Sequence, residues 1–400
     1  MLLEHWNEIA ARHRDDIAFW HHGKPSGITF GEIDSISRTV DTSSDTLIAI
    51  GTSLAFFPTL IAAWRTRKPV ILAENEQSKI RPIRGNVPAG TVLIKQTCGA
   101  SGIERSLFFD EAAVLAEGLR NLSGLGLHRE RRGLAAISLA HSYGFGCLAL
   151  PLLLRGIPLD IAPGPMPMFL NPALERGGPI FLPGVPAIWK TWWQTGITSH
   201  PAISLALSAG SPLSLKLEQA IHASSNLKIH NFYGTSETGA IAFDASHTPR
   251  STETYLGTCL PGITVDCNHE GYLTVRSDAQ ASGSDLPVFP GEFTSGTYRT
   301  WDLGHNSAGE IHLTRCTGAA INVAGRKVSP ARLEKILRQL PGVSTARISR
   351  APSRDFERLE EIHAHLGVSH DYDKKALREE LRKRIESWEM PRHWDFQVNA

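Results

Sequence analysis

Between about residues 45 and 245, short runs of β-branched and other apolar residues alternate with segments of helical periodicity. The runs have the length of strands rather than of buried helices. In chain order they are TLIAI, PVIL, TVLI, LAAISL, PLDIA, PIFL, ISLALS and LKIHNFY. Strands that alternate with helices predict a mostly parallel sheet with helices on its faces. The chain is therefore expected to be an α/β protein.

The pattern changes toward the C-terminus. From about 255 to 315, short strands alternate with glycine-rich turns, which predicts a small antiparallel or barrel-like unit packed on the sheet. After Arg315 we expect a helix, two strands and a charged amphipathic helix, DYDKKALREELRKRIESW. At 400 residues the chain is long for one core. The prediction is a large domain over 1–314 and a small α+β domain over 315–400.

Composition bears on partners and compartment. The 41 basic and 40 acidic side chains leave a formal charge of +1 without a long run of either sign, so no nucleic-acid or membrane patch is predicted. The five cysteines lie far apart without metal-binding spacing, which fits a reducing compartment. The first residues, MLLEHWNEIAARHRDD, lack the apolar core of a signal peptide. These features predict a cytoplasmic protein.

Two uncharged stretches, 47–64 and 134–154, approach the length of a membrane-spanning helix. The first reads as a strand that turns into a helix, and the second is interrupted by His141 and Pro151. Both are expected to be buried strand–helix units of a parallel sheet.

The segment NFYGTSETG, residues 231–239, follows the strand-like LKIH and resembles the Y-G-x-[ST]-E signature of adenylate-forming enzymes, which include acyl-CoA synthetases, aryl-acid ligases and luciferases. Their carboxylate substrate attacks the α-phosphorus of ATP while pyrophosphate leaves. The site needs a hydroxyl on phosphate, a carboxylate for Mg²⁺ and close backbone approach. The resemblance assigns these roles to Ser236, Glu237 and Gly234. It implies nucleotide contacts by the other residues of the segment, Asn231, Phe232, Tyr233 and Thr235.

Taken alone, this segment leaves open a less favoured alternative, a strand that ends in a polar turn with Glu237 merely solvated. Further segments match the same family in the same chain order. LSAGSPLS resembles the part that borders the adenine and acyl pockets, where Gly210 and Ser211 allow close approach of the nucleotide. YRTWDLG resembles the Y-x-T-G-D-x-G motif, so Asp302 is the expected ribose ligand and Arg315 its companion. Trp301 stands where the family has glycine.

The phosphate loop of the family, T-S-G-T-T-G-x-P-K, corresponds here to TCGASGIER, residues 97–105. The loop keeps the hydroxyls and glycines that cradle phosphates, and arginine replaces lysine. Its expected phosphate-binding residues are Thr97, Gly99, Ser101, Gly102 and Arg105. On its own this segment could be an ordinary turn.

HSYGFG, residues 141–146, resembles the H-x-x-G segment that borders the triphosphate and the acyl tunnel. A lone histidine beside apolar residues is more often structural than functional. Its position in the series of motifs makes His141 a candidate catalytic residue, with both interpretations open. The candidate acid pocket is short and partly aromatic, and it is formed by Tyr143, Phe145, Gly146, Ala209 and Phe232. It favours a benzoate-like or cinnamate-like acid over a long fatty chain.

The resemblance implies ATP and Mg²⁺ as cofactors, and CoA or the phosphopantetheine of an acyl carrier protein as the thiol acceptor. It also implies INVAGRKVSP as the turn that opens the C-terminal domain, and a swing of that domain about 315–318 between the two half-reactions. Members continue to a G-K motif with an adenylation lysine, whereas this sequence stops at Ala400. This ending is compatible with a truncated chain. It is equally compatible with a natural chain that works more slowly or with another cation. A fatty-acid ligase, and a relative that binds nucleotide without catalysis, remain alternatives.

Overall fold

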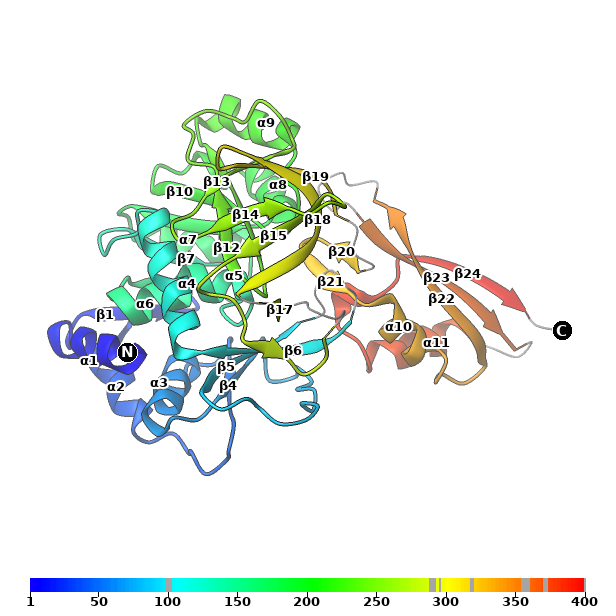
Figure 1. Ribbon diagram of the computed structural model, residues 1–400, viewed down its shortest axis with the longest axis horizontal. Coiled ribbons are helices and arrows are strands. Elements are labelled where there is room, and N and C mark those ends of the chain that lie inside the picture. Colours follow the sequence, from blue (N-terminus) through cyan, green and yellow to red (C-terminus); the bar gives the residue numbers. More distant parts are fainter. Residues whose placement is uncertain are drawn as a thin grey trace. The chain divides into compact units, whose positions relative to one another are not determined.

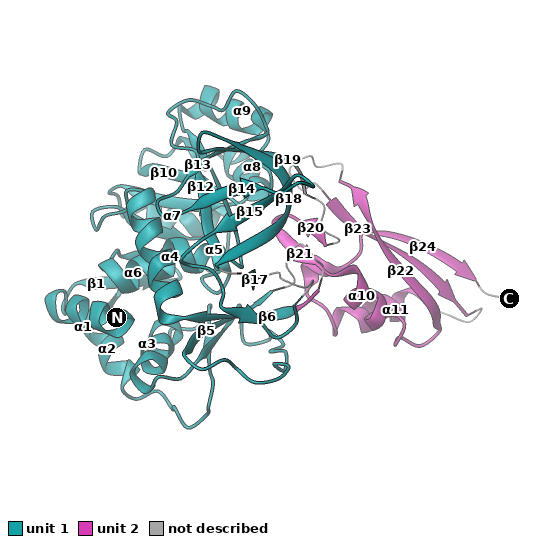
Figure 2. Cartoon of the chain, viewed as in Figure 1, with its two compact units in different colours: residues 1–97, 105–315 teal, residues 98–104, 316–400 magenta. Residues whose placement is uncertain are grey.

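A computed structural model of the chain describes residues 1–97, 103–287, 293–294, 296–316, 320–353, 360–369 and 373–398 (Figure 1). Contacts divide the chain into two compact units (Figure 2). Unit 1 comprises 1–97 and 105–315, and unit 2 comprises 98–104 and 316–400. The predicted boundary at 314/315 lies one residue from this division, and the grouping of 98–104 with unit 2 was not predicted. Independent mobility of the second unit stays a prediction.

The first third of unit 1 contributes four strands and the covering helices of a small five-stranded sheet. Its strand order is β16-β6-β5-β4-β3, in which β16 (Gly283–Ser284) comes from much later in the chain. The α2 helix begins at a capping box, in which Thr29 and Glu32 satisfy each other's backbone amides. The elements of this part are α1 (Leu2–Arg12), β1 (Ile17–His21), β2 (Ile28–Thr29), α2 (Phe30–Ser37), β3 (Leu47–Ile50), α3 (Phe56–Thr66), β4 (Val70–Ala73), β5 (Thr91–Thr97), β6 (Arg105–Asp110) and α4 (Glu111–Gly124).

The middle of unit 1 builds the parallel part of a larger sheet. The pairs β7–β9, β9–β10, β10–β11, β7–β8 and β1–β8 are all parallel. The elements are β7 (Arg132–Ala135), α5 (Ser142–Gly144), the π-helix η1 (Phe145–Ala149), α6 (Leu150–Arg155), β8 (Leu159–Ile161), α7 (Pro167–Glu175), β9 (Ile180–Gly184), α8 (Pro186–Gln194), η2 (Ile197–Ser199), β10 (Ile203–Ser208), α9 (Leu215–Ser225) and β11 (Ile229–Thr235). All eight predicted strands are present.

The two faces of this sheet are buried in different cores. Along β10, Leu205 and Leu207 belong to the core that also contains residues of α3, α4 and α6, whereas Ala206 belongs to the core formed with α7, α8 and α9. Successive side chains of a strand point to opposite faces, so both faces need apolar residues. This is why the strand sequences read as continuous apolar runs.

The region 239–316 contains the segment that was expected to be a small antiparallel or barrel-like unit, and its described strands do not form a barrel. Its antiparallel strands continue the large sheet beyond β11 in the order β12-β13-β19-β18-β15-β14, and among the described residues the ladder does not close on itself. The antiparallel character itself is confirmed. The elements are β12 (Gly239–Phe243), β13 (Tyr255–Cys259), β14 (Thr264–Cys267), β15 (Tyr272–Arg276), β16 (Gly283–Ser284), β17 (Phe293–Thr294), β18 (Thr297–Ser307) and β19 (Glu310–Cys316).

Unit 2 is a small α+β unit with its own core. The strand β22 pairs antiparallel with β23, and β23 pairs parallel with β24. The last predicted helix ends at Arg382 rather than near residue 388, and the strand β24 was not predicted. The elements are β20 (Ile321–Val323), β21 (Arg326–Val328), α10 (Pro330–Leu337), β22 (Val343–Pro352), β23 (Glu360–Val368), α11 (Lys374–Arg382), η4 (Ser387–Glu389) and β24 (His393–Val398).

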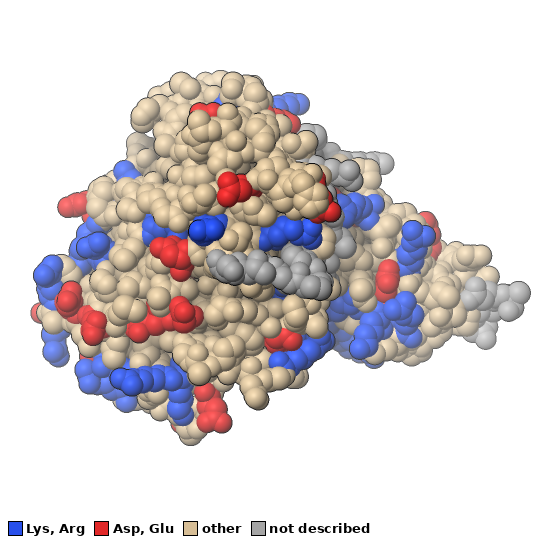
Figure 3. Space-filling view, in the orientation of Figure 1, with Lys and Arg blue, Asp and Glu red and all other residues tan. Residues whose placement is uncertain are grey.

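Acidic and basic side chains are interspersed over unit 1 on the face shown in Figure 3. Within the described ranges, the structure has no helix that is both long and apolar enough to span a membrane. The two uncharged stretches form strand–helix units, as expected.

Candidate active site

The predicted signature segment is a tight β-hairpin. The strands β11 and β12 pair antiparallel, with Thr235 opposite Gly239, and residues 236–238 form the loop. The backbone amide of Thr238 donates to Oγ1 of Thr235 at 3.2 Å. A Cβ on Gly234 would lie 2.7 Å from the carbonyl oxygen of Gly239, so a larger residue there would push the strands apart. Ser236 and Glu237 are therefore held on a short, closed loop.

Two predicted nucleotide-binding residues meet beside this hairpin. The phenol of Tyr233 donates a hydrogen bond to Oδ2 of Asp302 at 2.7 Å, from β11 to β18. The backbone amide of Asp302 is fixed in turn by Oγ1 of Thr300 at 3.1 Å. The carboxylate is thus oriented, although 69 residues separate it from the tyrosine. Only the fold brings the two motifs together.

The carboxyl ends of β9 and β10 lie at the same edge of the sheet, beside Asn231 of β11. Ser208 at the end of β10 is in register with Gly184 of β9 and Asn231 of β11. Ligands of open α/β sheets bind at this edge. The predicted residues Ala209, Gly210 and Ser211 follow directly, and Gly210 turns the chain with a φ of +82°.

The end of β10 presents hydroxyls that can bind a ligand. Among the described residues, Oγ of Ser208 and Oγ of Ser211 are buried and have no hydrogen-bond partner. Buried polar groups are normally hydrogen-bonded. The two hydroxyls therefore fit a polar ligand at this edge, and Ser208 was not predicted from the sequence.

The neighbouring residues Asn231 and Phe232 are engaged in packing. Nδ2 of Asn231 donates to the carbonyl oxygen of Leu256 at 3.0 Å, which ties β11 to β13. The ring of Phe232 stacks on Tyr143, with centroids 5.9 Å apart and planes 29° apart. Burial raises the pKa of the Tyr143 phenol well above its usual value. Tyr143 therefore stays neutral and forms an apolar wall.

Glu237 forms a buried ion pair that the sequence did not predict. Oε1 of Glu237 accepts from Nη2 of Arg105 at 2.8 Å, and the two side chains are 6% and 0% exposed. The Arg105 guanidinium carbon also lies 5.7 Å from the centre of the Phe293 ring. Both residues were candidates, but as phosphate and metal ligands rather than as partners of each other.

This pairing bears on the predicted Mg²⁺ ligand. A cation bound by Glu237 would take the place that the Arg105 guanidinium occupies. As described, the site does not fit Mg²⁺ at this carboxylate, because a buried carboxylate balanced by one cation has no charge left for a second. Mg²⁺ at Glu237 stays a prediction, and no step below depends on it.

The candidate His141 is connected to the hairpin loop by its neighbour Ser142. Oγ of Ser142 donates to Oγ of Ser236 at 3.2 Å. The imidazole Nε2 of His141 lies 3.1 Å from Oε1 of Glu74, and the histidine side chain is 48% exposed. Glu74 orients an accessible imidazole, and the role of His141 in catalysis stays a prediction.

A second buried ion pair lies behind the hairpin. Nζ of Lys95 donates to Oε2 of Glu117 at 3.0 Å, and the side chains are 3% and 4% exposed. A Cβ on Gly146 would lie 2.6 Å from Oε1 of Glu117, so a larger residue there would have to displace the Glu117 carboxylate. The Glu117 carboxyl carbon lies 3.3 Å from the position of a Cβ on Gly239. The hairpin therefore packs on this pair.

Lys95 and Glu117 were missed by sequence reasoning. The only available signal was a lone lysine inside the apolar run TVLIKQT. Two predicted pocket residues, Phe145 and Gly146, belong to this packed region rather than to an open wall. Phe145 is fully buried, with Nζ of Lys95 5.9 Å from its ring centre. Their assignment to the acid pocket stays a prediction that the packing disfavours.

The predicted phosphate loop is described only at its ends. Thr97, the last residue of β5, is in register with Arg105, the first of β6. The candidates Gly99, Ser101 and Gly102 lie outside the described residues. Arg315 lies on β19, and its side chain is likewise outside the description.

Part of the chain resembles known proteins in sequence. Residues 112–283 match the sequence profile of the AMP-binding enzyme family. A curated relative, the mitochondrial acyl-coenzyme A synthetase ACSM2 of Rattus norvegicus, is 25% identical over an alignment of 238 residues that covers 53% of this chain and 41% of the relative. The match thus spans about two fifths of that protein's length.

Solved structures resemble the whole chain. A double mutant of o-succinylbenzoate CoA synthetase (MenE) from Bacillus subtilis has a TM-score of 0.83 at 15% identity, with 98% of this chain and 94% of that one covered. A malonyl-CoA ligase with methylmalonyl-CoA and AMP bound has a TM-score of 0.81 at 16% identity, with 96% of both chains covered. The adenylation-PCP di-domain NpsA-ThdA from Klebsiella oxytoca has a TM-score of 0.81 at 17% identity, with 98% and 93% covered.

These matches show the class of the fold. Residues 112–283 carry the sequence profile of AMP-binding enzymes, and the whole chain has the fold of adenylate-forming enzymes. The resemblance expected from the motifs is confirmed to that extent, and with it a mixed α/β fold. The cellular compartment stays a prediction, since the named relative is mitochondrial.

Proposed function

We propose that this protein uses ATP to convert a carboxylic acid into an acyl-adenylate, releases pyrophosphate, and transfers the acyl group to a thiol. The observation that carries the proposal is the meeting of Tyr233 with Asp302 beside unpartnered hydroxyls at the carboxyl edge of the sheet. The match of residues 112–283 to the AMP-binding family and the likeness to CoA ligases support it.

The described residues suggest how the nucleotide is held. The Asp302 carboxylate, oriented by Tyr233 and by the Thr300 hydroxyl, can accept hydrogen bonds from ribose hydroxyls. The hydroxyls of Ser208 and Ser211 can bond to the base or the acyl group at the strand ends. Bound in this way, the nucleotide presents its α-phosphorus to the acid, and fixed orientation accounts for a large part of the rate.

The hairpin loop supplies polar groups to the reacting phosphate. Ser236, supported by the Ser142 hydroxyl at 3.2 Å, can donate to a phosphate oxygen. When phosphate enters, the Arg105 guanidinium can turn from Glu237 toward the new negative charge, because a charge-assisted bond to phosphate replaces the one it gives up. Mg²⁺ is part of the proposal as the ion that ATP carries on its own phosphates.

The acid is proposed to be a short aryl acid such as a hydroxybenzoate or a cinnamate. Support comes from the ring of Phe232, which is buried, stacked on the partly buried ring of Tyr143, and from the small Ala209 of the same core. One structural neighbour is named for an aryl acid, o-succinylbenzoate. Another is a fatty acyl CoA synthetase, so a fatty acid is the competing class of substrate.

The acceptor is proposed to be CoA or the phosphopantetheine of an acyl carrier protein. Two of the similar structures are CoA ligases, and a third joins an adenylation domain to a PCP domain. The described residues do not favour one acceptor over the other.

The test is pyrophosphate release by the chain with Mg-ATP and a panel of benzoates, cinnamates and fatty acids, followed by mass spectrometry of thioesters formed with CoA or a loaded carrier protein. Release that depends on an aryl acid is expected, and it should fall at least tenfold in Asp302→Ala. Release with fatty acids only would overturn the aryl-acid assignment. Acid-independent release would overturn adenylation.

A second function is favoured by the Arg105–Glu237 pair. Because each charge already balances the other, the protein could bind nucleotide without turning it over. Binding of ATP or AMP, measured by calorimetry, without pyrophosphate release for any acid and in a chain extended at its C-terminus, would establish this alternative in place of the ligase.

A further inference from the structure

Unit 2 presents a cluster of histidines on one face of its three-stranded sheet. Along β23, Ile362, Ala364 and Leu366 are buried in the core of the unit. The alternating residues His363 and His365 therefore point to the opposite face. The parallel register places His393 beside His363 and Asp395 beside His365 on β24. Four groups that can bind a metal thus share one face.

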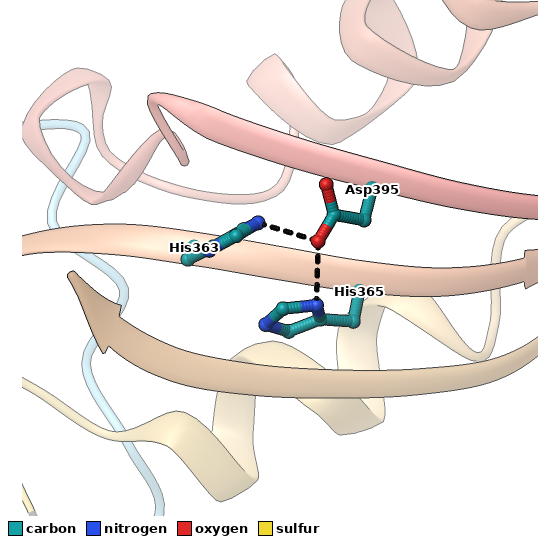
Figure 4. Close-up of side chains that lie close together, drawn as sticks. All are labelled: His363, His365 and Asp395. Atoms are coloured by element: carbon teal, nitrogen blue, oxygen red, sulfur yellow. Dashed lines mark ion pairs between the residues drawn. The ribbon is translucent and has the colours of Figure 1, made fainter.

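Three of these side chains converge (Figure 4). Nε2 of His363 and Nδ1 of His365 each lie 2.9 Å from Oδ2 of Asp395. The two imidazole centroids are 4.0 Å apart, and no two of the three ligand atoms are more than 4.8 Å apart. Of the residues that the structure describes, this is the one group of three or more histidine, cysteine or acidic side chains so close together.

We propose that His363, His365 and Asp395 form a site for a divalent late first-row transition ion, of which Zn²⁺ is the leading candidate. Two imidazoles and one carboxylate are a set that Zn²⁺ accepts, whereas Mg²⁺ and Ca²⁺ prefer oxygen ligands. Tetrahedral bonds of about 2.1 Å put ligand atoms roughly 3.4 Å apart. Side-chain rotation on an accessible surface can supply the remaining adjustment.

His365 has the hydrogen bond that a metal-binding histidine needs on its other nitrogen. Its Nε2 lies 2.9 Å from Oγ of Ser349 on β22. When Nε2–H donates to this hydroxyl, Nδ1 carries the lone pair and faces the Asp395 carboxylate. Such a contact orients the ring and fixes the tautomer that binds a metal. Ser349 is therefore a positioning residue.

The site is open to an ion from solution. The side chains of His363, His365 and Asp395 are 25%, 38% and 64% exposed, although Nε2 of His363 is itself covered and has no hydrogen-bond partner among the described residues. His393 has its ring centroid 5.6 Å from that of His363, while its Nε2 lies 2.8 Å from Oε2 of Glu361. A metal with three protein ligands leaves one position, which His393 or water can fill. Bound metal would cross-link β23 to the edge strand β24.

Protons compete for the same atoms. Without a metal, imidazoles held on Asp395 by charge alone would give the same short distances. The two states differ in what they do with added metal. Only a metal site will bind one equivalent of Zn²⁺ through these side chains.

The experiment is titration of the full chain with Zn²⁺ against a chromophoric chelator, together with the visible spectrum of the Co²⁺-loaded protein. The variants are His363→Ala, His365→Ala and Asp395→Asn, and circular dichroism checks that each is folded. The chain has 17 histidines, so His128→Gln is the matched control: His128 is half exposed and pairs with a single carboxylate, that of Glu130.

We expect one equivalent of Zn²⁺ to bind, at least tenfold more weakly in each site variant, with affinity unchanged in His128→Gln. The Ser349→Ala variant should bind several-fold more weakly, because only the orienting bond is lost. Binding that is equally strong in the three site variants, or absent from the wild-type chain, would overturn the proposal. Neither result depends on ligase activity, so the outcome is independent of the proposed function.

Discussion

The signature hairpin in unit 1 and the histidine face in unit 2 differ in the solvent exposure of their ionisable side chains. Around the hairpin, Arg105, Glu237, Lys95 and Glu117 are all buried and joined as two ion pairs. On the histidine face the ionisable side chains are between 14% and 64% exposed. In one region the ionisable side chains are buried and paired, and in the other they are open to solvent.

This difference determines what each charge contributes. A buried charge is costly to leave alone, so each partner in unit 1 depends on the other, and the hairpin that packs on them is held rigidly. An exposed charge in water costs little to leave unpaired. Side chains on the face of unit 2 are therefore free to exchange partners, which suits a site that takes its ligand from solution.

The largest effect is expected for the pair behind the hairpin. Lys95→Met should lower the free energy of unfolding by about 4 kcal/mol, because it leaves the Glu117 carboxylate buried without its cation. Urea unfolding followed by tryptophan fluorescence measures it. Adding Glu117→Leu to the first change should restore most of the loss. The exposed Lys216→Met is the control, and an equal loss there would show that burial is not the cause.

Glu237→Gln should cost about 3 kcal/mol in unfolding, because it leaves the buried Arg105 guanidinium without an anion. Acid-dependent pyrophosphate release should also fall at least a hundredfold, because Glu237 positions the Arg105 guanidinium that the proposal directs toward phosphate. The double variant Arg105→Met/Glu237→Leu separates the two effects, since it should regain stability but not activity. A Glu237→Gln protein that is fully active would remove Glu237 from the proposed site.

Asp285 links stability to pH. Burial acts to raise the pKa of its carboxyl, but hydrogen bonds from Arg81, the Ser106 amide and the Arg84 amide together lower the pKa below its ordinary value. A lowered folded-state pKa stabilises the protein above the unfolded-state pKa, and this stabilisation is lost as pH falls through the folded-state value.

Asp285→Asn should therefore cost about 2 kcal/mol near pH 7, and the difference from wild type should shrink below about pH 4. Urea unfolding at a series of pH values checks this. A difference that stays constant from pH 7 to pH 3 would contradict the linkage.

A smaller effect is expected at the ribose site. Tyr233→Phe removes one hydrogen bond to Asp302 and keeps the ring, so ATP and AMP should bind about fivefold more weakly, which is about 1 kcal/mol. Isothermal titration calorimetry with AMP measures it. Tyr272→Phe, on another strand of the same sheet, is the control and should leave AMP affinity unchanged.

The smallest effect belongs to the open face of unit 2. His365→Ala should change the free energy of unfolding by no more than about 0.5 kcal/mol when a chelator removes metal, because an exposed pair contributes little. In the presence of Zn²⁺, the wild-type chain alone should gain thermal stability. A large loss in the chelated protein would show that the histidines support the fold directly.

The sequence by itself determined the α/β class, all eight strands of the central region and the motifs that relate the chain to adenylate-forming enzymes. Apolar periodicity and short motifs are local, and both can be read along the chain. Even the turn at Ser236 followed from the residues around it.

The tertiary structure determined which polar and charged side chains pair with each other. The pairs Arg105–Glu237, Lys95–Glu117 and Tyr233–Asp302 join residues 132, 22 and 69 positions apart. The antiparallel strands of 239–316 likewise extend the large sheet instead of closing a barrel. Sequence specifies which side chains need a partner, because burying a lone charge is costly. Which partner each one meets depends on strand order and register, and those are fixed only when the whole core packs.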